Sequence, residues 1–354
     1  MSSLTRDQVL AAMAANRTLE GLDLEGLDLS GADLTGGRFH GCSLRGADFS
    51  GANVLKTGFR DCDFGGARFE GTDLTKVDLR GMRLAGAVLR RARMHMTLLQ
   101  QSDFSGADLR ESELTWSMAQ HSNFQGADLR SMKIVKSMLS HSCLDGAQFA
   151  GASLDRVVFN GSTFKGARLK GGSFFKIMLR EADLEGQDIS GQLFAQVLLD
   201  GANLKGANLS GADLSMSNFM GADLTGADLS GAQARSCMFN GAMARGADFS
   251  RADLTKGYFG EADLSGADFS GATMVHAVLA KALCPGARFA GAQLQHSDFS
   301  HADITRADFS RASLYRAKMH RAKDKDARWD GATRLMLQGT DKDLEEAENW
   351  TRPA

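Results

Sequence analysis

The sequence of 354 residues predicts an all-β solenoid, and three observations lead to that prediction. Large apolar residues recur at every fifth position, which fits neither the helical period of 3.6 nor the strand period of 2. Glycine recurs every twenty positions, and the composition (40 Gly, 2 Pro, 7% aromatic) is unlike that of ordinary globular domains. A short extended step followed by a turn, repeated, would bring each apolar residue to the same side of a coil.

The five-residue frame runs without a slip from Leu24 to Met319. It contains 60 central positions, and all but four hold Leu, Phe, Ile, Val or Met. A small residue stands two places before most central positions, with Asp or Asn commonly between them, as in "ANL" at 202–204. The exceptions at the central position are Ala119, Ala234, Ala244 and Cys284.

A column of glycines defines a longer period. Fourteen glycines follow one another every twenty residues from Gly26 to Gly286. We infer a coil of twenty residues, with one corner that needs either a positive φ or close backbone contact.

These repeats resemble the pentapeptide repeat family. The stretches "ADLSGADFS" at 262–270 and "ANLKGANLSGADLS" at 202–215 fit its motif closely. The resemblance implies a right-handed quadrilateral parallel β-helix, with four pentapeptides to a coil and the large and small residues pointing inward. Sixty repeats would make about 15 coils, roughly 70 Å long at the spacing of parallel strands.

The open ends of such a stack need covers, and we expect short helical caps at both ends. The predicted domains are 1–20, an N-terminal capping helix and entry; 21–320, the β-helix; and 321–354, a C-terminal cap. A capping box from Thr5 to Gln8 predicts a helix from about Arg6 to Asn16. The apolar run at 9–15 also fits a signal peptide, but a helix is favoured.

At the far end, Trp329 is expected to plug the last coil. A short helix should begin between Thr340 and Asp343 and run through Asn349. The tail residues expected to cover the exposed core are Leu335, Met336, Leu337, Leu344 and Trp350.

One column departs from the repeat, because apolar residues replace the outward Asp before the central residue. From residue 98 to residue 278 in steps of twenty, this column is apolar except at Asn218. Aromatic and basic residues lie beside this column. The small inward residue of the repeat is replaced there by Thr97, Ser117 and Ser137, which favours better-formed strands. The candidate partner-binding residues are Met96, Leu98, Trp116, Met118, Val135, Lys136, Met138, Arg156, Val158, Phe175, Lys176, Met178, Leu198, Met238, Tyr258 and Val278.

Three interpretations of this apolar stripe stay open at this point. The stripe can be a ladder of side chains that pack on one another. It can be covered by a terminal segment of the chain. It can also be a face that binds a partner or a second copy, because soluble monomers rarely expose large contiguous apolar patches.

Composition excludes several functional classes. The net charge is −2, from 41 basic and 43 acidic residues, so bulk charge favours neither direct nucleic-acid binding nor an acidic mimic of nucleic acid. No apolar run is long enough for a membrane span. Five scattered cysteines favour a reducing compartment, hence a cytoplasmic protein, with secretion by a route without a signal peptide left open.

No residues combine into a catalytic, cofactor or metal site, so we predict that the protein is not an enzyme and binds no cofactor. Two histidine pairs are spaced by twenty, His121 with His141 and His276 with His296, but neither has an evident third ligand. Cys42 and Cys62 should be within disulfide reach, although buried thiols are the favoured interpretation. A filled solenoid also leaves no concave pocket.

We therefore predict a non-enzymatic protein-interaction scaffold or adaptor that docks a protein partner, or a second copy, on its apolar and basic face. The family resemblance implies an alternative, a bacterial DNA mimic that binds DNA gyrase and protects it from quinolones. Against it, Lys56, Lys76 and Lys136 lie in one column where a mimic should carry acids. The opening "LEGLDLEGLDLSGADL" resembles, more weakly, members associated with type VI secretion.

Overall fold

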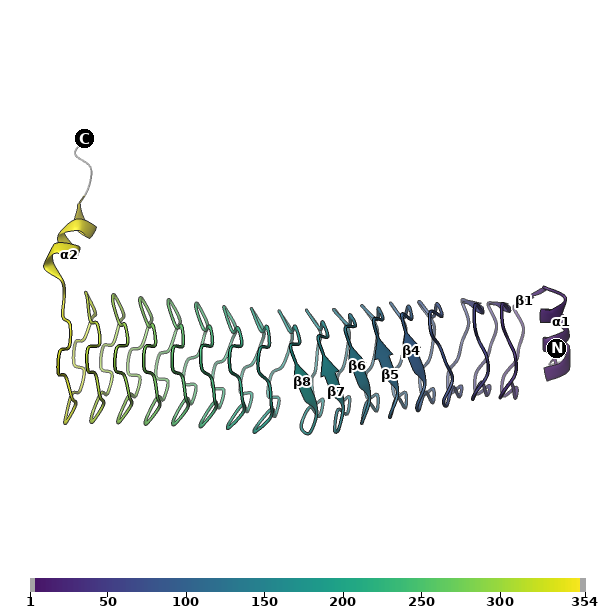
Figure 1. Cartoon of the computed structure of the whole chain (residues 1–354), viewed down its shortest axis with the longest axis horizontal. Helices are drawn as coiled ribbons and strands as arrows, with labels where there is room; N and C mark the ends of the chain where they lie inside the picture. Colours follow the sequence, from purple (N-terminus) through teal and green to yellow (C-terminus); the bar gives the residue numbers. More distant parts are fainter. Residues whose placement is uncertain (1–3, 351–354) are drawn as a thin grey trace. The chain divides into compact units, whose positions relative to one another are not determined.

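The computed structural model describes residues 4–350 and divides into two compact units. Unit 1 is Met1–Asp183 and unit 2 is Leu184–Ala354. Each unit is a parallel β-solenoid of about eight turns, whose bridges join residues twenty apart (Figure 1). The predicted fold class is confirmed, and the coil count differs from the expected 15, since each unit has about eight turns of its own.

Backbone hydrogen bonds between successive turns fix the twenty-residue period. The N–H groups of Leu24 and Gly26 donate to the carbonyls of Ser43 and Arg45, nineteen residues later, both at 2.8 Å. The N–H of Ser43 donates back to Leu22 at 2.9 Å. These bonds satisfy backbone groups that would otherwise be buried without partners.

The Asp of the repeat supplies a further acceptor at the corner. The carboxylate of Asp103 accepts the N–H of Ser105 at 3.0 Å, and that of Asp263 accepts the N–H of Ser265 at 3.1 Å. An Asp or Asn side chain that accepts from the backbone two residues later is an ordinary turn device. The preference for Asp before the central residue therefore has a local cause.

The glycine column lies at a corner with positive φ, as predicted; Gly126, for example, has a φ of 66°. An added Cβ at Gly126 would meet nothing within 4 Å, so close contact is not the reason for glycine there. Lys136 and His121 adopt the same left-handed conformation at other corners. Glycine thus lowers the strain of a geometry that every corner requires.

The regular strands form two parallel sheets, both in unit 1, with the orders β1-β2-β3 and β4-β5-β6-β7-β8. Figure 1 shows β4 to β8 on successive turns. The strands are β1 (Thr18–Glu20), β2 (Arg38–His40), β3 (Gly58–Arg60), β4 (Arg93–His95), β5 (Glu113–Thr115), β6 (Lys133–Val135), β7 (Ser153–Asp155) and β8 (Ser173–Phe175).

The expected strands along the apolar stripe were misplaced, because β4 to β8 lie in the preceding pentapeptide. A ladder of buried hydroxyls follows β4 and β5. The N–H of Thr97 donates to Oγ of Ser117 at 3.0 Å, and the N–H of Ser117 donates to Oγ of Ser137 at 3.1 Å. At most corners the equivalent N–H instead closes a turn onto the carbonyl three residues earlier. The N–H groups of Ser122 and Ser142 also donate to serine hydroxyls, and no regular strand precedes them, so this contact accompanies β4 and β5 without determining them.

The register also changes near the end of unit 1. Gly151 donates its N–H to Gly171, twenty residues on, whereas Ser131 donates to Ala150, nineteen residues on. Gly171 has a φ of 84°, against 66° at Gly126. This change of register lies in the last turns of unit 1.

Stacked aromatic rings fill the core of each unit. In unit 1, Phe104 and Phe124 stack with ring centroids 5.0 Å apart. In unit 2, rings stack at successive turns with centroid separations of 4.6–5.0 Å. That column consists of Phe249, Phe269, Phe289, Phe309 and Trp329.

Helix α1 (Arg6–Ala14) caps the first turn of unit 1 as predicted. Its capping box is complete, with the Thr5 hydroxyl accepting from the N–H of Gln8 and the Gln8 side chain accepting from the N–H of Thr5. Val9 is fully buried, and the end of Met13 lies where a Cβ at Gly37 would be. The helix therefore covers the open core with apolar side chains.

At the other end, Trp329 stacks on Phe309, but the tail, as far as residue 350, does not cover the core. Helix α2 (Lys342–Asn349) has no buried residue, and Leu335, Leu344 and Trp350 are 65%, 46% and 68% exposed. That part of the predicted cap is wrong, because polar contacts hold α2 against the side of the last turns. Parallel bridges continue to Gln338, and the domain boundaries at 20 and 320 stay predictions.

Replacing Ser117 with Ala should lower the free energy of unfolding by ~1–3 kcal/mol, because the N–H of Thr97 and the carbonyl of Met94 lose their hydroxyl partner. Chemical denaturation followed by circular dichroism measures the change. Ser153→Ala, at an exposed position of β7, is the matched control and should change the midpoint little. Equal effects of the two variants would contradict the hydroxyl ladder.

Candidate functional site

The apolar stripe of unit 1 is a vertical column on its surface. Parallel bridges join Leu98 to Met118, Met118 to Met138, Met138 to Val158 and Val158 to Met178. The three methionines remain 42%, 41% and 39% exposed although they are neighbours in this column, and the other two residues are half-buried. Packing of the column on itself therefore leaves much of its apolar surface in water.

Cationic and aromatic residues line the corner beside this column. Nζ of Lys136 lies 4.2 Å from the ring centre of Trp116, and Nζ of Lys176 lies 5.0 Å from that of Phe175. Within residues 4–350, neither lysine forms an ion pair. Such contacts favour a cation over an aromatic face while leaving its charge available.

Arg156, the third cation of this corner, is neutralised locally. It forms a bidentate contact with Asp155, at distances down to 2.6 Å. The hydrogen bond from Arg156 lowers the pKa of the Asp155 carboxyl. The free charge of the corner therefore comes from Lys136 and Lys176.

The structure places all the unit 1 candidate residues outward, around one corner formed by two adjoining pentapeptides, rather than on a single face. Val135 belongs to β6 and Phe175 to β8, while the stripe follows the corner. We call the group the Met–Lys corner. It consists of Met96, Leu98, Trp116, Met118, Val135, Lys136, Met138, Arg156, Val158, Phe175, Lys176 and Met178.

The stripe lacks a stabilising hydrogen bond that the Asp of the repeat normally makes. Where Asp precedes the central residue, its carboxylate caps the N–H two residues later; at Met118 and Met138 no such acceptor exists. Among the described residues, the N–H groups of Gln120 and Ser140 have no hydrogen-bond acceptor. A hydrogen bond of this kind is worth about 0.5–1.5 kcal/mol. The cap is therefore absent on successive turns of this column.

Unit 2 carries a shorter apolar column. Bridges join Leu198, Asn218, Met238, Tyr258 and Val278 in that order. Asn218 is only 7% exposed and donates from Nδ2 to Asp200 at 2.6 Å. The column is therefore interrupted at Asn218, and only Met238, Tyr258 and Val278 form a continuous apolar run.

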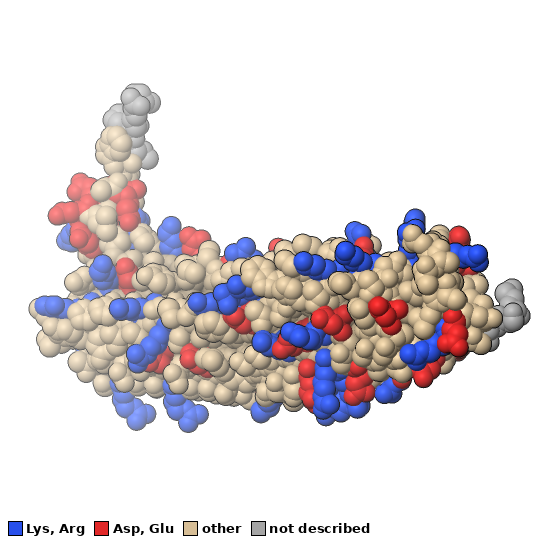
Figure 2. Space-filling model, turned by 45° about the vertical axis from the view of Figure 1, so that its right-hand side comes forward, with Lys and Arg blue, Asp and Glu red and all other residues tan. Residues whose placement is uncertain are grey.

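Elsewhere the acidic columns are paired with arginine. Asp108 accepts from Arg90 at 2.6 Å and from Arg110 at 2.8 Å, and Arg130 holds Asp128 at 2.6 Å. The hydrogen bond from Arg130 lowers the pKa of Asp128. Figure 2 shows basic and acidic groups interspersed on the visible surface. This neutralisation does not favour a duplex-DNA mimic, which needs unpaired rows of negative charge.

The predicted histidine and cysteine pairs are neighbours in space. The rings of His121 and His141 stack with centroids 5.0 Å apart, and neither joins a cluster of three potential metal ligands within residues 4–350. Cys42 and Cys62 are free and buried. A hydrogen bond between the two thiols lowers the pKa of Cys42 to about 6 and, together with burial, raises that of Cys62.

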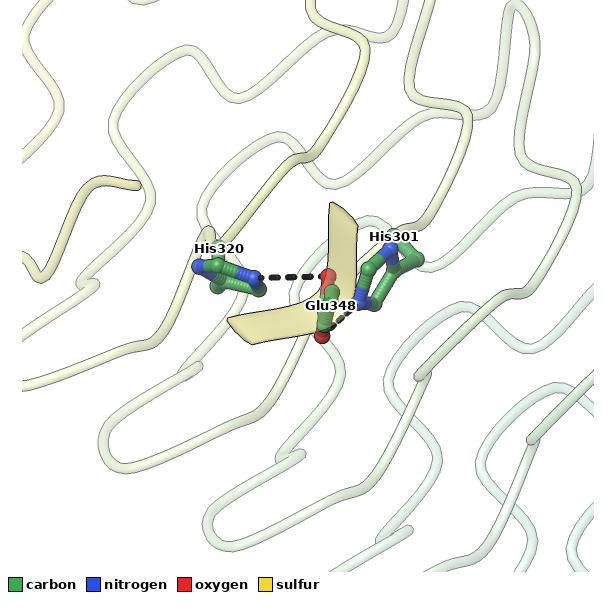
Figure 3. A group of neighbouring side chains, drawn as sticks. All are labelled: His301, His320 and Glu348. Carbon is green, nitrogen blue, oxygen red and sulfur yellow. Dashed lines mark hydrogen bonds and ion pairs between the residues drawn. The ribbon is translucent and has the colours of Figure 1, made fainter. Parts of the chain in front are cut away.

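One cluster was not found from the sequence. His301, His320 and Glu348 converge where α2 lies against the last turns of unit 2 (Figure 3). Hydrogen bonds from Arg321, His320 and His301 lower the pKa of Glu348 to about 2. The spacing of nineteen between the histidines was the available signal, but Glu348 comes from a helix whose position the repeat does not determine.

Two family models, both described as pentapeptide repeats, match the chain. One matches residues 18–54, 97–131, 139–174, 179–215, 217–255, 258–292 and 282–321, and the other matches 38–83. The chain belongs to the pentapeptide repeat family. No curated protein sequence matches it. Within residues 4–350, no helix has the length and apolar character needed to cross a membrane.

Similar solved structures are pentapeptide repeat proteins as well. A trypsin-treated variant of QnrB1, a plasmid-mediated fluoroquinolone resistance protein, is 25% identical, with 52% of this chain and 82% of that chain covered and a TM-score of 0.33. HetL, involved in heterocyst differentiation regulation in the cyanobacterium Nostoc, is 28% identical. The match covers 73% of this chain and 88% of that chain, with a TM-score of 0.16. These low TM-scores support no transfer of function, and the weaker resemblance to secretion-associated members finds no support among these matches.

Dilute hydrogen peroxide should oxidise Met118, Met138 and Met178 well before Met94 and Met132, because the first three residues are exposed and the other two are buried. Peptide mass spectrometry after a short exposure gives the rate at each site. The buried Met94 and Met132, which belong to the same turns, are the internal controls. Similar rates at buried and stripe methionines would show that the stripe is not exposed.

Proposed function

We propose that the protein is a non-enzymatic interaction scaffold that docks a protein partner on the Met–Lys corner of unit 1. The observation that carries this proposal is the column Met118, Met138 and Met178, about two-fifths exposed, beside the unpaired cations Lys136 and Lys176. Methionine, tryptophan and other aromatic residues are favoured at the centres of protein interfaces. Methionine also adapts its shape to different partners.

The two other interpretations of the stripe have less support. A ladder that packs only on itself does not explain why three methionines stay exposed where Asp would cap the backbone. Cover by a terminal segment within unit 1 is also disfavoured, because α1 packs by Val9 and Met13 onto the first turns. The third interpretation, an external partner that covers the apolar stripe, has the most support.

The charge of the corner favours a different protein over a second copy. In a two-fold symmetric dimer the same patch meets itself, so Lys136 and Lys176 of each copy would approach like charges. A partner that presents apolar side chains flanked by carboxylates would bury the methionines and pair with both lysines. We therefore propose an acidic, amphipathic segment of another protein as the ligand.

The substitution Met138→Lys should weaken this binding by about 2 kcal/mol or more, roughly 30-fold, because it places a charge at the centre of the apolar column. A photo-crosslinking amino acid at position 118 in producing cells should yield a discrete conjugate, and Met138→Lys should suppress it. Thermal unfolding should stay unchanged, since the lysine remains in solvent.

The matched control is Met243, which is 46% exposed in a different column of unit 2. A crosslinker at position 243 should give no such conjugate, and Met243→Lys should leave the conjugate at 118 intact. The same products from both positions, or none from position 118, would refute the docking role. A conjugate of twice the chain mass would show instead that a second copy occupies the corner.

A further inference from the structure

Two imidazole rings and a carboxylate converge on the side of the last turns of unit 2 (Figure 3). Nε2 of His301 lies 3.1 Å from Oε1 of Glu348, and Nε2 of His320 lies 3.4 Å from Oε2 of the same residue. The three donor atoms all lie within 4.8 Å of one another. The geometry points to a binding site for a divalent transition-metal ion, best matched by Zn²⁺, which is a separate property from the docking role of unit 1.

The distances suit a tetrahedral ion. Zn²⁺ with ligand bonds near 2.0–2.1 Å places its donor atoms about 3.3–3.4 Å apart. The two nitrogen–oxygen distances, 3.1 and 3.4 Å, are close to that value, and each nitrogen approaches a different oxygen of Glu348. Imidazole with carboxylate is a donor set that suits Zn²⁺, whereas Mg²⁺ and Ca²⁺ prefer oxygen alone. Water would take the fourth position.

Neighbouring groups hold the ligands in place before an ion arrives. The side chain of His320 is only 7% exposed, and its Nδ1 accepts the N–H of Asp341 at 3.1 Å. Nη1 of Arg321 donates to Oε2 of Glu348 at 3.0 Å and so fixes the carboxylate. The contact with Arg321 orients the carboxylate, although its charge also opposes a cation and limits affinity, whereas the contact at Nδ1 of His320 holds that ring only until an ion binds.

Metal binding requires a change of tautomer at His320. Because Nδ1 accepts from Asp341, the neutral ring carries its proton on Nε2, where it points at Glu348. A metal ion takes the lone pair of Nε2, so the proton leaves that nitrogen and Nδ1 becomes protonated. The N–H of Asp341 then loses its acceptor at the start of α2. This local rearrangement distinguishes metal binding from a simple ion pair.

The test uses the full-length chain after treatment with a chelator, titrated with Zn²⁺ by calorimetry and with Co²⁺ by visible absorption. We expect one equivalent of Zn²⁺ to bind, and His301→Ala or Glu348→Gln to weaken binding at least tenfold. The matched control is His276→Ala. His276 and His296 stack with centroids 4.9 Å apart, and neither joins a three-ligand cluster within residues 4–350.

Nuclear magnetic resonance supplies a second readout. The amide signal of Asp341 should shift when Zn²⁺ is added to the original chain. The same addition to the Glu348→Gln variant should leave that signal unchanged. The proposal is overturned if no Zn²⁺ binds, or if His301→Ala and Glu348→Gln bind it as tightly as His276→Ala does. Loss of binding in His276→Ala alone would assign the ion to the stacked pair and would equally overturn it.

Discussion

Hydrogen bonding between successive turns is the constraint on which the rest of the structure depends. Each pentapeptide donates backbone N–H groups to carbonyls nineteen residues later, as Leu24 does to Ser43. An insertion of one residue would break these bonds and turn inward side chains outward. The absence of any slip in the five-residue frame follows from this requirement, and so does the stacking of like side chains, from the phenylalanine columns of the core to the methionine column of unit 1.

The same periodicity makes departures from the repeat informative. An Asp before the central residue caps a backbone N–H, so its replacement costs stability without any gain inside the core. At Met118 and Met138 this cost recurs on successive turns, and the exposed thioethers that result lie beside Lys136 and Lys176. The buried hydroxyls of Ser117 and Ser137 alter the same corner from the inside. The proposed docking surface and the missing backbone caps thus lie at the same corner of unit 1.

The two terminal helices are attached by different physical means. Apolar packing by Val9 and Met13 attaches α1 to the first turns, whereas hydrogen bonds and ion pairs attach α2 beside the last ones. The tail sequence contains enough leucine and tryptophan to predict an apolar cover over the last turn. Glu348 and Asp341 instead reach His320, and this polar attachment turns the helix away from the open core.

The sequence by itself determined the fold class, the twenty-residue turn, the inward residues and the vertical neighbours of the stripe, because all of these follow from one local repeat and its hydrogen bonds. It also indicated α1, through a capping box that acts within four residues. Only the tertiary structure decided the placement of β4 to β8, the division into two units and the approach of Glu348 to His301 and His320. Those features depend on contacts between different turns, or between a turn and a helix, and no local period encodes them.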